Sequence, residues 1–171
     1  LSEDRTSIRS TEDIADTSKD GKVREQLKKH DYYAVVRSDA DAVSKIIASL
    51  KADELRNFSR TCVLYCGEMA DLVHRYSGVT IYSGGDDLLA LLPAESSSGE
   101  TVFHFARDAK DLFQKSFKTY IDAIKAANAE KKPGEDPIPV PSLSLGISIC
   151  YSKFPLYEAL DDSADLLFDY A

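Results

Sequence analysis

The chain has 171 residues, of which 43% are hydrophobic, and its formal net charge is −8. These values predict one folded domain with a real core and exclude global disorder, and the absence of any run of about 18 apolar residues excludes a transmembrane helix. The acidic balance argues against strong nucleic-acid binding by this chain alone, because such binding needs a basic stripe.

Residues 1–31 are predicted to form a linker or exposed tail. The first twenty are rich in Ser, Thr, Asp and Glu, have no sustained apolar period and lack the apolar core of a signal peptide. A short, mostly polar helix is expected over residues 19–30.

A buried strand is predicted for residues 32–39, which are β-branched and aromatic and end in acidic residues. Two helices are predicted next, over about residues 41–51 and 53–76. The apolar face of the first helix comprises Val43, Ile46, Ile47 and Leu50. The stripe of the second comprises Leu55, Phe58, Cys62, Tyr65, Cys66, Met69, Leu72, Val73 and Tyr76.

Three cysteines without framework spacing favour reduced thiols and a cytoplasmic protein. Cys62 and Cys66 lie four residues apart on one helix face. No pair of histidines has the spacing that would complete a four-ligand zinc site. We therefore interpret the two cysteines as small apolar members of the helix stripe rather than as half of a metal site.

Two short apolar runs, residues 79–83 and 88–93, flank Gly84-Gly85-Asp86-Asp87 and predict a β-hairpin with this tetrad at its turn. A loop is expected over residues 95–100. Residues 101–129 predict one long helix, because apolar and aromatic side chains recur at three- and four-residue steps.

Four prolines within residues 133–141 predict an exposed excursion without helix or central strand. In the strand predicted next, over residues 142–152, apolar residues alternate with small residues. Leu143, Leu145, Ile147 and Ile149 share one face, and Ser144, Gly146 and Ser148 share the other. A closing helix begins near Pro155. The order of elements predicts an α+β fold, with a mainly antiparallel sheet and helices packed on one face.

Two acidic clusters, Asp39-Ala40-Asp41 and Asp86-Asp87, flank predicted strands. If the first strand pairs with the hairpin, their carboxylates converge at one sheet edge, and Mg²⁺ or Mn²⁺ relieves the repulsion. Cations bridging phosphate oxygens are a recurring arrangement in phosphoryl transfer, and glycines at the turn allow a nucleotide close to the backbone. The alternative is an ordinary solvated hairpin tip.

Three blocks, "YYAVVRSDADAV", "YSGGDDLLALLP" and "PSLSLGISICYSKFPLYEALDDSADLLFDYA", together resemble the large subunit of type III CRISPR interference complexes, above all its Cmr-type branch. The resemblance covers residues 32–171 and corresponds to the second palm domain, which carries the GGDD tetrad. It implies a ferredoxin-like palm of βααββαβ order, related to nucleotide cyclase palms, and a chain that is part of a larger multidomain subunit.

The resemblance also implies a function. Such subunits use ATP and divalent metal to make 3′–5′ cyclic oligoadenylates for antiviral defence when their complex binds target RNA. Carried over, the metal-binding positions are Asp39, Ala40 (through its carbonyl), Asp41, Asp86 and Asp87. Asp86 and Asp87 are the catalytic positions, and Ser83, Gly84 and Gly85 contact nucleotide. Many relatives have Gly where this chain has Ala40.

The implied partners are other subunits of the CRISPR ribonucleoprotein, its guide and target RNA indirectly, and a second palm domain. Two other functions stay open. One is an assembly module whose palm is catalytically silent. The other is a homodimeric diguanylate cyclase, which fits less well because that family has Glu at the position of Asp87 and Phe at the position of Leu88.

Overall fold

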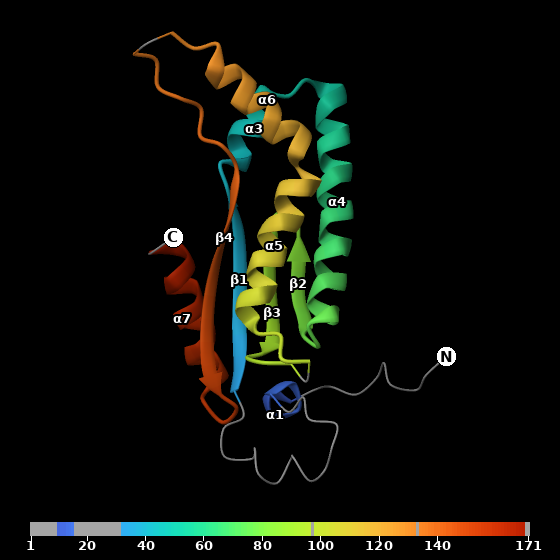
Figure 1. Ribbon diagram of the computed structural model, residues 1–171, viewed down its shortest axis with the longest axis vertical. Helices are drawn as coiled ribbons and strands as arrows, with labels where there is room; N and C mark the ends of the chain where they lie inside the picture. The colour runs from blue at the N-terminus through green and yellow to red at the C-terminus, as the bar shows by residue number, and fades with distance from the viewer. Residues whose placement is uncertain (1–9, 16–31, 97, 133, 170–171) are drawn as a thin grey trace, which may run out of the picture.

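The computed structural model describes residues 10–15, 32–96, 98–132 and 134–169, and arranges them around one four-stranded sheet (Figure 1). In chain order the elements are α1 (Thr11–Ala15), β1 (Tyr32–Asp41), α3 (Val43–Ser49), α4 (Ala52–Arg75), β2 (Val79–Gly84), β3 (Asp87–Pro93), α5 (Val102–Ser116), α6 (Lys118–Ala129), β4 (Ser142–Tyr151) and α7 (Leu156–Phe168). Within these ranges, no helix has the length and apolar character needed to cross a membrane.

The sheet has the strand order β2-β3-β1-β4, and every neighbouring pair is antiparallel. The central strand β1 places Ser38 opposite Leu88 of β3 and opposite Leu145 of β4. This register brings the acidic end of β1 beside the start of β3. The predicted α+β class, antiparallel sheet and βααββ start are confirmed.

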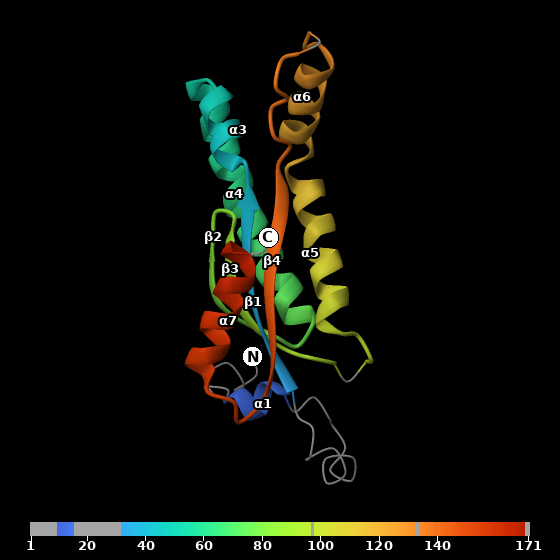
Figure 2. The ribbon, with the colours of Figure 1, turned by 90° about the vertical axis from the view of Figure 1, so that its left-hand side faces the viewer.

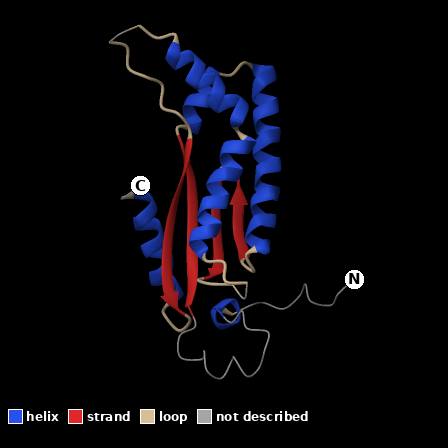
Figure 3. Ribbon diagram, viewed as in Figure 1, coloured by secondary structure: helices blue, strands red, loops and turns tan. Residues whose placement is uncertain are grey.

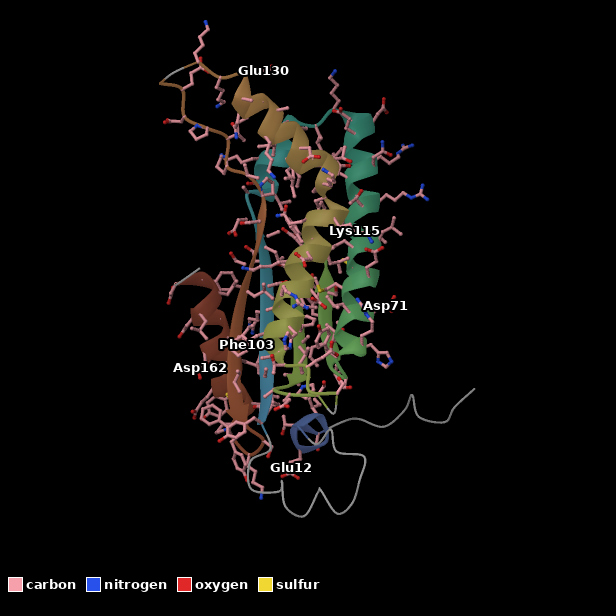
Figure 4. The ribbon with its side chains drawn as sticks, viewed as in Figure 1. Glu12, Asp71, Phe103, Lys115, Glu130 and Asp162 are labelled. Atoms are coloured by element: carbon pink, nitrogen blue, oxygen red, sulfur yellow. The ribbon has the colours of Figure 1, made fainter. Side chains whose placement is uncertain are left out.

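Helices α4 and α5 cover the first face of the sheet, where the main apolar core lies. Four aromatic rings from α4, α5 and the α5–α6 junction form its densest part, with centroids 4.8 to 5.8 Å apart: Phe58, Tyr65, Phe113 and Phe117. Charged side chains point the other way, as Asp71 on α4 shows in Figure 4. The helix stripes predicted from the sequence therefore face this core.

Helix α7 packs on the second face of the sheet, which corrects the expectation that helices cover one face only. It contacts β4 and β1, and Figure 2 shows α5 and α7 on opposite sides of the sheet. A smaller apolar cluster fills the space beneath, formed by Ile14, Tyr33, Val35, Leu91, Cys150 and Ala159. The approach is close: a Cβ atom added to Gly146 would lie 2.9 Å from both the backbone nitrogen and Cβ of Leu167.

The sequence predicts an exposed tail at the N-terminus, but the described part of this segment is a short helix packed against the sheet. Ile14 of α1 is only 2% exposed and joins the second-face cluster. The Thr11 hydroxyl donates a hydrogen bond to the carbonyl of Ser152 at 2.9 Å. One apolar residue anchors α1, a signal too small for periodicity to detect. The helix predicted over residues 19–30 lies outside the described residues.

The single helix predicted for residues 101–129 is in fact two helices, α5 and α6, which meet at an angle (Figure 3). The junction is Phe117, with φ −100° and ψ 12°. No Gly or Pro marks it, and the apolar spacing continues through it, because Phe117 itself is buried among the aromatic rings. The break therefore has no signature in the sequence.

Three residues that the sequence places on apolar faces are exposed in the structure: Ile47 (45%), Leu55 (40%) and Ile149 (42%). The placement of Ile47 on a packed face is wrong because α3 has only seven residues, of which only Ile46 is buried. The predicted excursion is confirmed, since residues 134–141 contain neither helix nor strand.

A hydrogen bond between α4 and α5 gives a first test of the packing. The Tyr76 hydroxyl donates to the Asp108 carboxylate at 2.8 Å, and Arg107 donates to the same carboxylate. Burial, and then this bond, raise the pKa of Tyr76 to about 12. The Arg107 and Tyr76 bonds lower the pKa of Asp108 below its ordinary value.

We expect Tyr76→Phe to lower the free energy of unfolding by about 1 kcal/mol at pH 7, measured by urea unfolding. Because the pKa of Asp108 is lowered in the folded state, this difference should shrink as pH falls through that lowered value. Tyr65→Phe is the matched control: the Tyr65 hydroxyl is buried without a hydrogen-bond partner among the described residues. Removal of the Tyr65 hydroxyl should leave the free energy of unfolding unchanged or raise it. If both variants lost the same free energy of unfolding, the stabilising role of the Tyr76–Asp108 hydrogen bond would be contradicted.

Candidate functional site at the hairpin tip

The predicted hairpin is confirmed, and its tip lies beside the C-terminal half of β1 (Figure 2). Gly84 pairs with Asp87, which leaves Gly85 and Asp86 as a two-residue loop. Gly85 has a φ of +69°, a left-handed conformation that L side chains adopt only with strain. The second glycine of the tetrad is thus required by the turn itself.

Asp39 and Asp87 lie side by side across the β1–β3 pair, on the sheet face that also carries α7. Burial, a hydrogen bond with Asp87 and the charges of Asp87 and Asp41 raise the pKa of Asp39, and only the backbone N–H of Ala40 opposes them. Two like charges in contact destabilise the sheet unless a proton or a cation is shared between them. The predicted meeting of the two acidic clusters therefore holds for this pair.

Asp86 lies on the other side of the tip, within electrostatic range of Cys62 and Tyr65 on α4. Burial raises the pKa of Asp86, its own backbone N–H opposes this shift, and the charge of Asp39 adds to it. Burial is also the main reason that the pKa of Cys62 rises to about 11, so this thiol is protonated at neutral pH.

The remaining members of the first acidic cluster have other contacts. The Asp41 carboxylate accepts hydrogen bonds from Ser142 at 3.1 Å and from Ser144 at 2.7 Å, both on β4. Ala40 is 6% exposed and packs in the main core opposite Leu143. Asp41 thus acts on Asp39 through its charge rather than by direct contact.

Two hydrogen bonds attach the hairpin tip to α4. The Ser83 hydroxyl donates to the carbonyl of Cys66 at 3.4 Å, and the Cys66 thiol donates to the carbonyl of Gly85 at 3.5 Å. Ser83, which the resemblance assigns to nucleotide contact, is half-buried and its hydroxyl is directed at this helix. Cys66 therefore supports the turn, a role that its spacing from Cys62 does not reveal. In the described residues all three cysteines are free.

The donor set fits a hard divalent cation, because carboxylate oxygens are the ligands that Mg²⁺ and Mn²⁺ prefer. Within the described residues, however, no three His, Cys, Asp or Glu side chains are oriented together as a metal-binding group. The structure brings together Asp39 and Asp87, with Asp86 nearby and Asp41 held by its two serines.

Sequence reasoning did not single out Tyr82. This residue pairs with Leu89, two positions before the Gly84–Asp87 pair, so its side chain shares a sheet face with Asp87 and Asp39. It is 55% exposed. The sequence signal is the period of two along a strand, which places Tyr82 on the same face as Gly84, the first residue of the tetrad.

The profile of the Cas10/Cmr2 second palm domain matches residues 32–171, most of the chain. This chain belongs to the Cas10/Cmr2 family. The CRISPR system Cmr subunit Cmr2 of Pyrococcus furiosus is 31% identical over 126 residues, 74% of this chain and 10% of that protein. The Cas10/Cmr2 chain thus spans about a tenth of that relative.

Solved structures confirm the palm fold. Csm1 from T. onnurineus superposes with a TM-score of 0.65 at 14% identity over 94% of this chain and 21% of that one. A Csm1–Csm4 cassette solved with AMPPNP superposes with a TM-score of 0.61 at 14% identity, over 95% of this chain and 21% of that one. A cassette solved with cA4 superposes with a TM-score of 0.58 at 13% identity, over 93% of this chain and 21% of that one. The family match, together with this fold, identifies the domain as a palm of a type III CRISPR large subunit.

Proposed function

We propose that this Cas10/Cmr2 palm binds ATP with Mg²⁺ or Mn²⁺ at the hairpin tip and, within the intact subunit, joins ATP into cyclic oligoadenylate. The observation that carries this proposal is the contact between Asp39 and Asp87 across β1 and β3. Two adjacent carboxylates on neighbouring strands beside the hairpin tip favour a cation, and a cation there supplies affinity for a triphosphate. The nucleotide complexes of the Csm1–Csm4 cassettes support the same ligand class.

The proposed roles follow the observed positions. Asp39 and Asp87 hold the metal, with Asp86 and the Ala40 carbonyl as further oxygen donors, and Asp87 also orients the attacking hydroxyl. Gly85 leaves the backbone of the turn open to the nucleotide, Gly84 lets the Tyr82 ring lie over its backbone, and Ser83 holds the tip against α4. In the joining step a 3′-hydroxyl releases its proton to solvent and its oxygen bonds to the α-phosphorus of the next ATP, while the bond from the α-phosphorus to the bridging oxygen of the β-phosphate breaks and pyrophosphate leaves. When bound, the metal neutralises phosphate charge.

The domain organisation belongs to the same proposal. Residues 32–171 form the palm of a larger multidomain subunit, which works with a second palm, with other subunits of the ribonucleoprotein and indirectly with guide and target RNA. One hairpin tip offers one nucleotide site, so this chain alone should turn over ATP very slowly. The family match favours this function over a diguanylate cyclase.

Isothermal titration calorimetry tests the proposal directly. The chain should bind ATP with Mn²⁺ and not with EDTA, and Asp87→Asn should weaken binding by at least about tenfold, because a lost charged contact costs about 1.5–3 kcal/mol. Asp71→Asn, the same charge change on the outer side of α4, is the matched control (Figure 4). Equal affinity in all three proteins would reject the assignment of the site.

A further inference from the structure

Part of the second sheet face has no helix packed on it within the described residues. Helix α7 packs mainly on β4 and β1, and α1 contacts β1 and β3. Neither has its main contacts on β2, which lies at the sheet edge. On this open face near the hairpin tip lie Tyr82 of β2, the half-buried Leu89 of β3 and the Asp39–Asp87 pair.

The Tyr82 ring extends along its strand toward the tip. A Cβ atom added to Gly84 would lie 2.7 Å from Cζ of Tyr82, so the ring covers the backbone of this glycine. The described residues provide no hydrogen-bond partner for the Tyr82 hydroxyl, and 55% of the residue stays accessible. An aromatic ring thus lies over a glycine, on the sheet face that also carries two carboxylates, and no polar contact of this ring is found in the described part of the chain.

We propose that Tyr82 is the base-stacking residue of the nucleotide site, an inference that rests on the proposed function. Tyr82 is a diagonal neighbour of Asp87 in the β2–β3 pair, a relation that separates positions by about 7–8 Å. One nucleotide covers this distance, with its phosphates toward Asp39 and Asp87 and its base on the phenol ring. Leu89, on the same face, extends the apolar surface.

Stacking also defines what Tyr82 does not do. Every base has a π face, so stacking adds affinity for nucleotides without selecting among them. Tyr82 therefore anchors ATP and GTP equally, and the choice of adenine comes from other contacts. Gly84 belongs to the same surface, because a side chain there would push the ring aside.

The test compares three probes, each with Mn²⁺: ATP, GTP and inorganic tripolyphosphate, titrated into the full chain. Tyr82→Ala should lower the affinity for ATP and for GTP by about tenfold each, within the range of a lost base stack. Its affinity for tripolyphosphate should equal that of wild type. Tyr82→Phe should retain nucleotide binding within about twofold. Ile81→Ala is the matched control, since its neighbour Ile81 is 56% exposed on the same strand.

Each outcome is decisive. If Tyr82→Ala binds ATP as wild type does, or loses tripolyphosphate to the same extent as ATP, the stacking role is rejected and the proposed function stands. If Tyr82→Ala lowers the affinity for ATP but not for GTP, Tyr82 discriminates between the bases and the stacking role is again rejected. If wild type binds no nucleotide with Mn²⁺, the proposed function fails, and the stacking role fails with it.

Discussion

Gly146→Ala is expected to be the most destabilising single-methyl substitution in this Cas10/Cmr2 palm, with a loss of about 2–3 kcal/mol. The new Cβ would contact the Ser163 carbonyl and lie 2.9 Å from the Leu167 backbone. These atoms belong to helix α7 and cannot rotate away, so the helix must shift from β4. Overpacking of a fixed interior typically costs about 1–3 kcal/mol.

The shift of α7 would also stretch the hydrogen bond in which Nε of Arg37 donates to the Ser163 hydroxyl at 3.2 Å. Urea unfolding measures the loss, and the m-value should stay constant if α7 remains folded. Gly67→Ala is the matched control, because a Cβ atom added there on α4 meets nothing within 4 Å. It should stabilise the protein by about 1 kcal/mol, since Gly disfavours a helix interior. A Gly146→Ala variant as stable as wild type would show that α7 is not held closely on the sheet.

This contact explains why the second helical layer escaped prediction. Ser144, Gly146 and Ser148 look like the solvent face of a strand, since small polar residues usually lie there. In the structure Gly146 and Ser148 are buried, because their small size lets α7 come close to β4. Periodicity detects apolar area and does not detect the absence of a side chain.

The hairpin and its carboxylates were predictable because their causes are local. Gly85 fixes the turn, and the apolar runs on either side fix the strands. The Asp39–Asp87 contact needed one further assumption, that β1 pairs with β3. The separation of Asp41 from this pair was not predictable, because it depends on Ser142 and Ser144, about a hundred residues away in sequence.

Asp39→Asn is expected to change stability in opposite directions without and with metal. In EDTA at pH 7 the variant should be more stable by about 0.5 kcal/mol, since a like-charge pair directly across two strands is destabilising by a similar amount. With Mn²⁺ and ATP at about 100 times the dissociation constant, wild type should gain about 2.7 kcal/mol and the variant much less. Thermal unfolding in the two buffers measures both effects.

The pH dependence fixes the cause of the gain in EDTA. The pKa of Asp39 is raised in the folded state, so the folded protein holds this proton more tightly than the unfolded chain. Wild-type stability should therefore fall as pH rises through the raised value. The advantage of Asp39→Asn should be full above that value and disappear below the ordinary Asp pKa of about 3.9. An advantage that persists at pH 3 would point to packing rather than to the charge of Asp39, and the carboxylate pair would then lose its role as the feature that favours a cation.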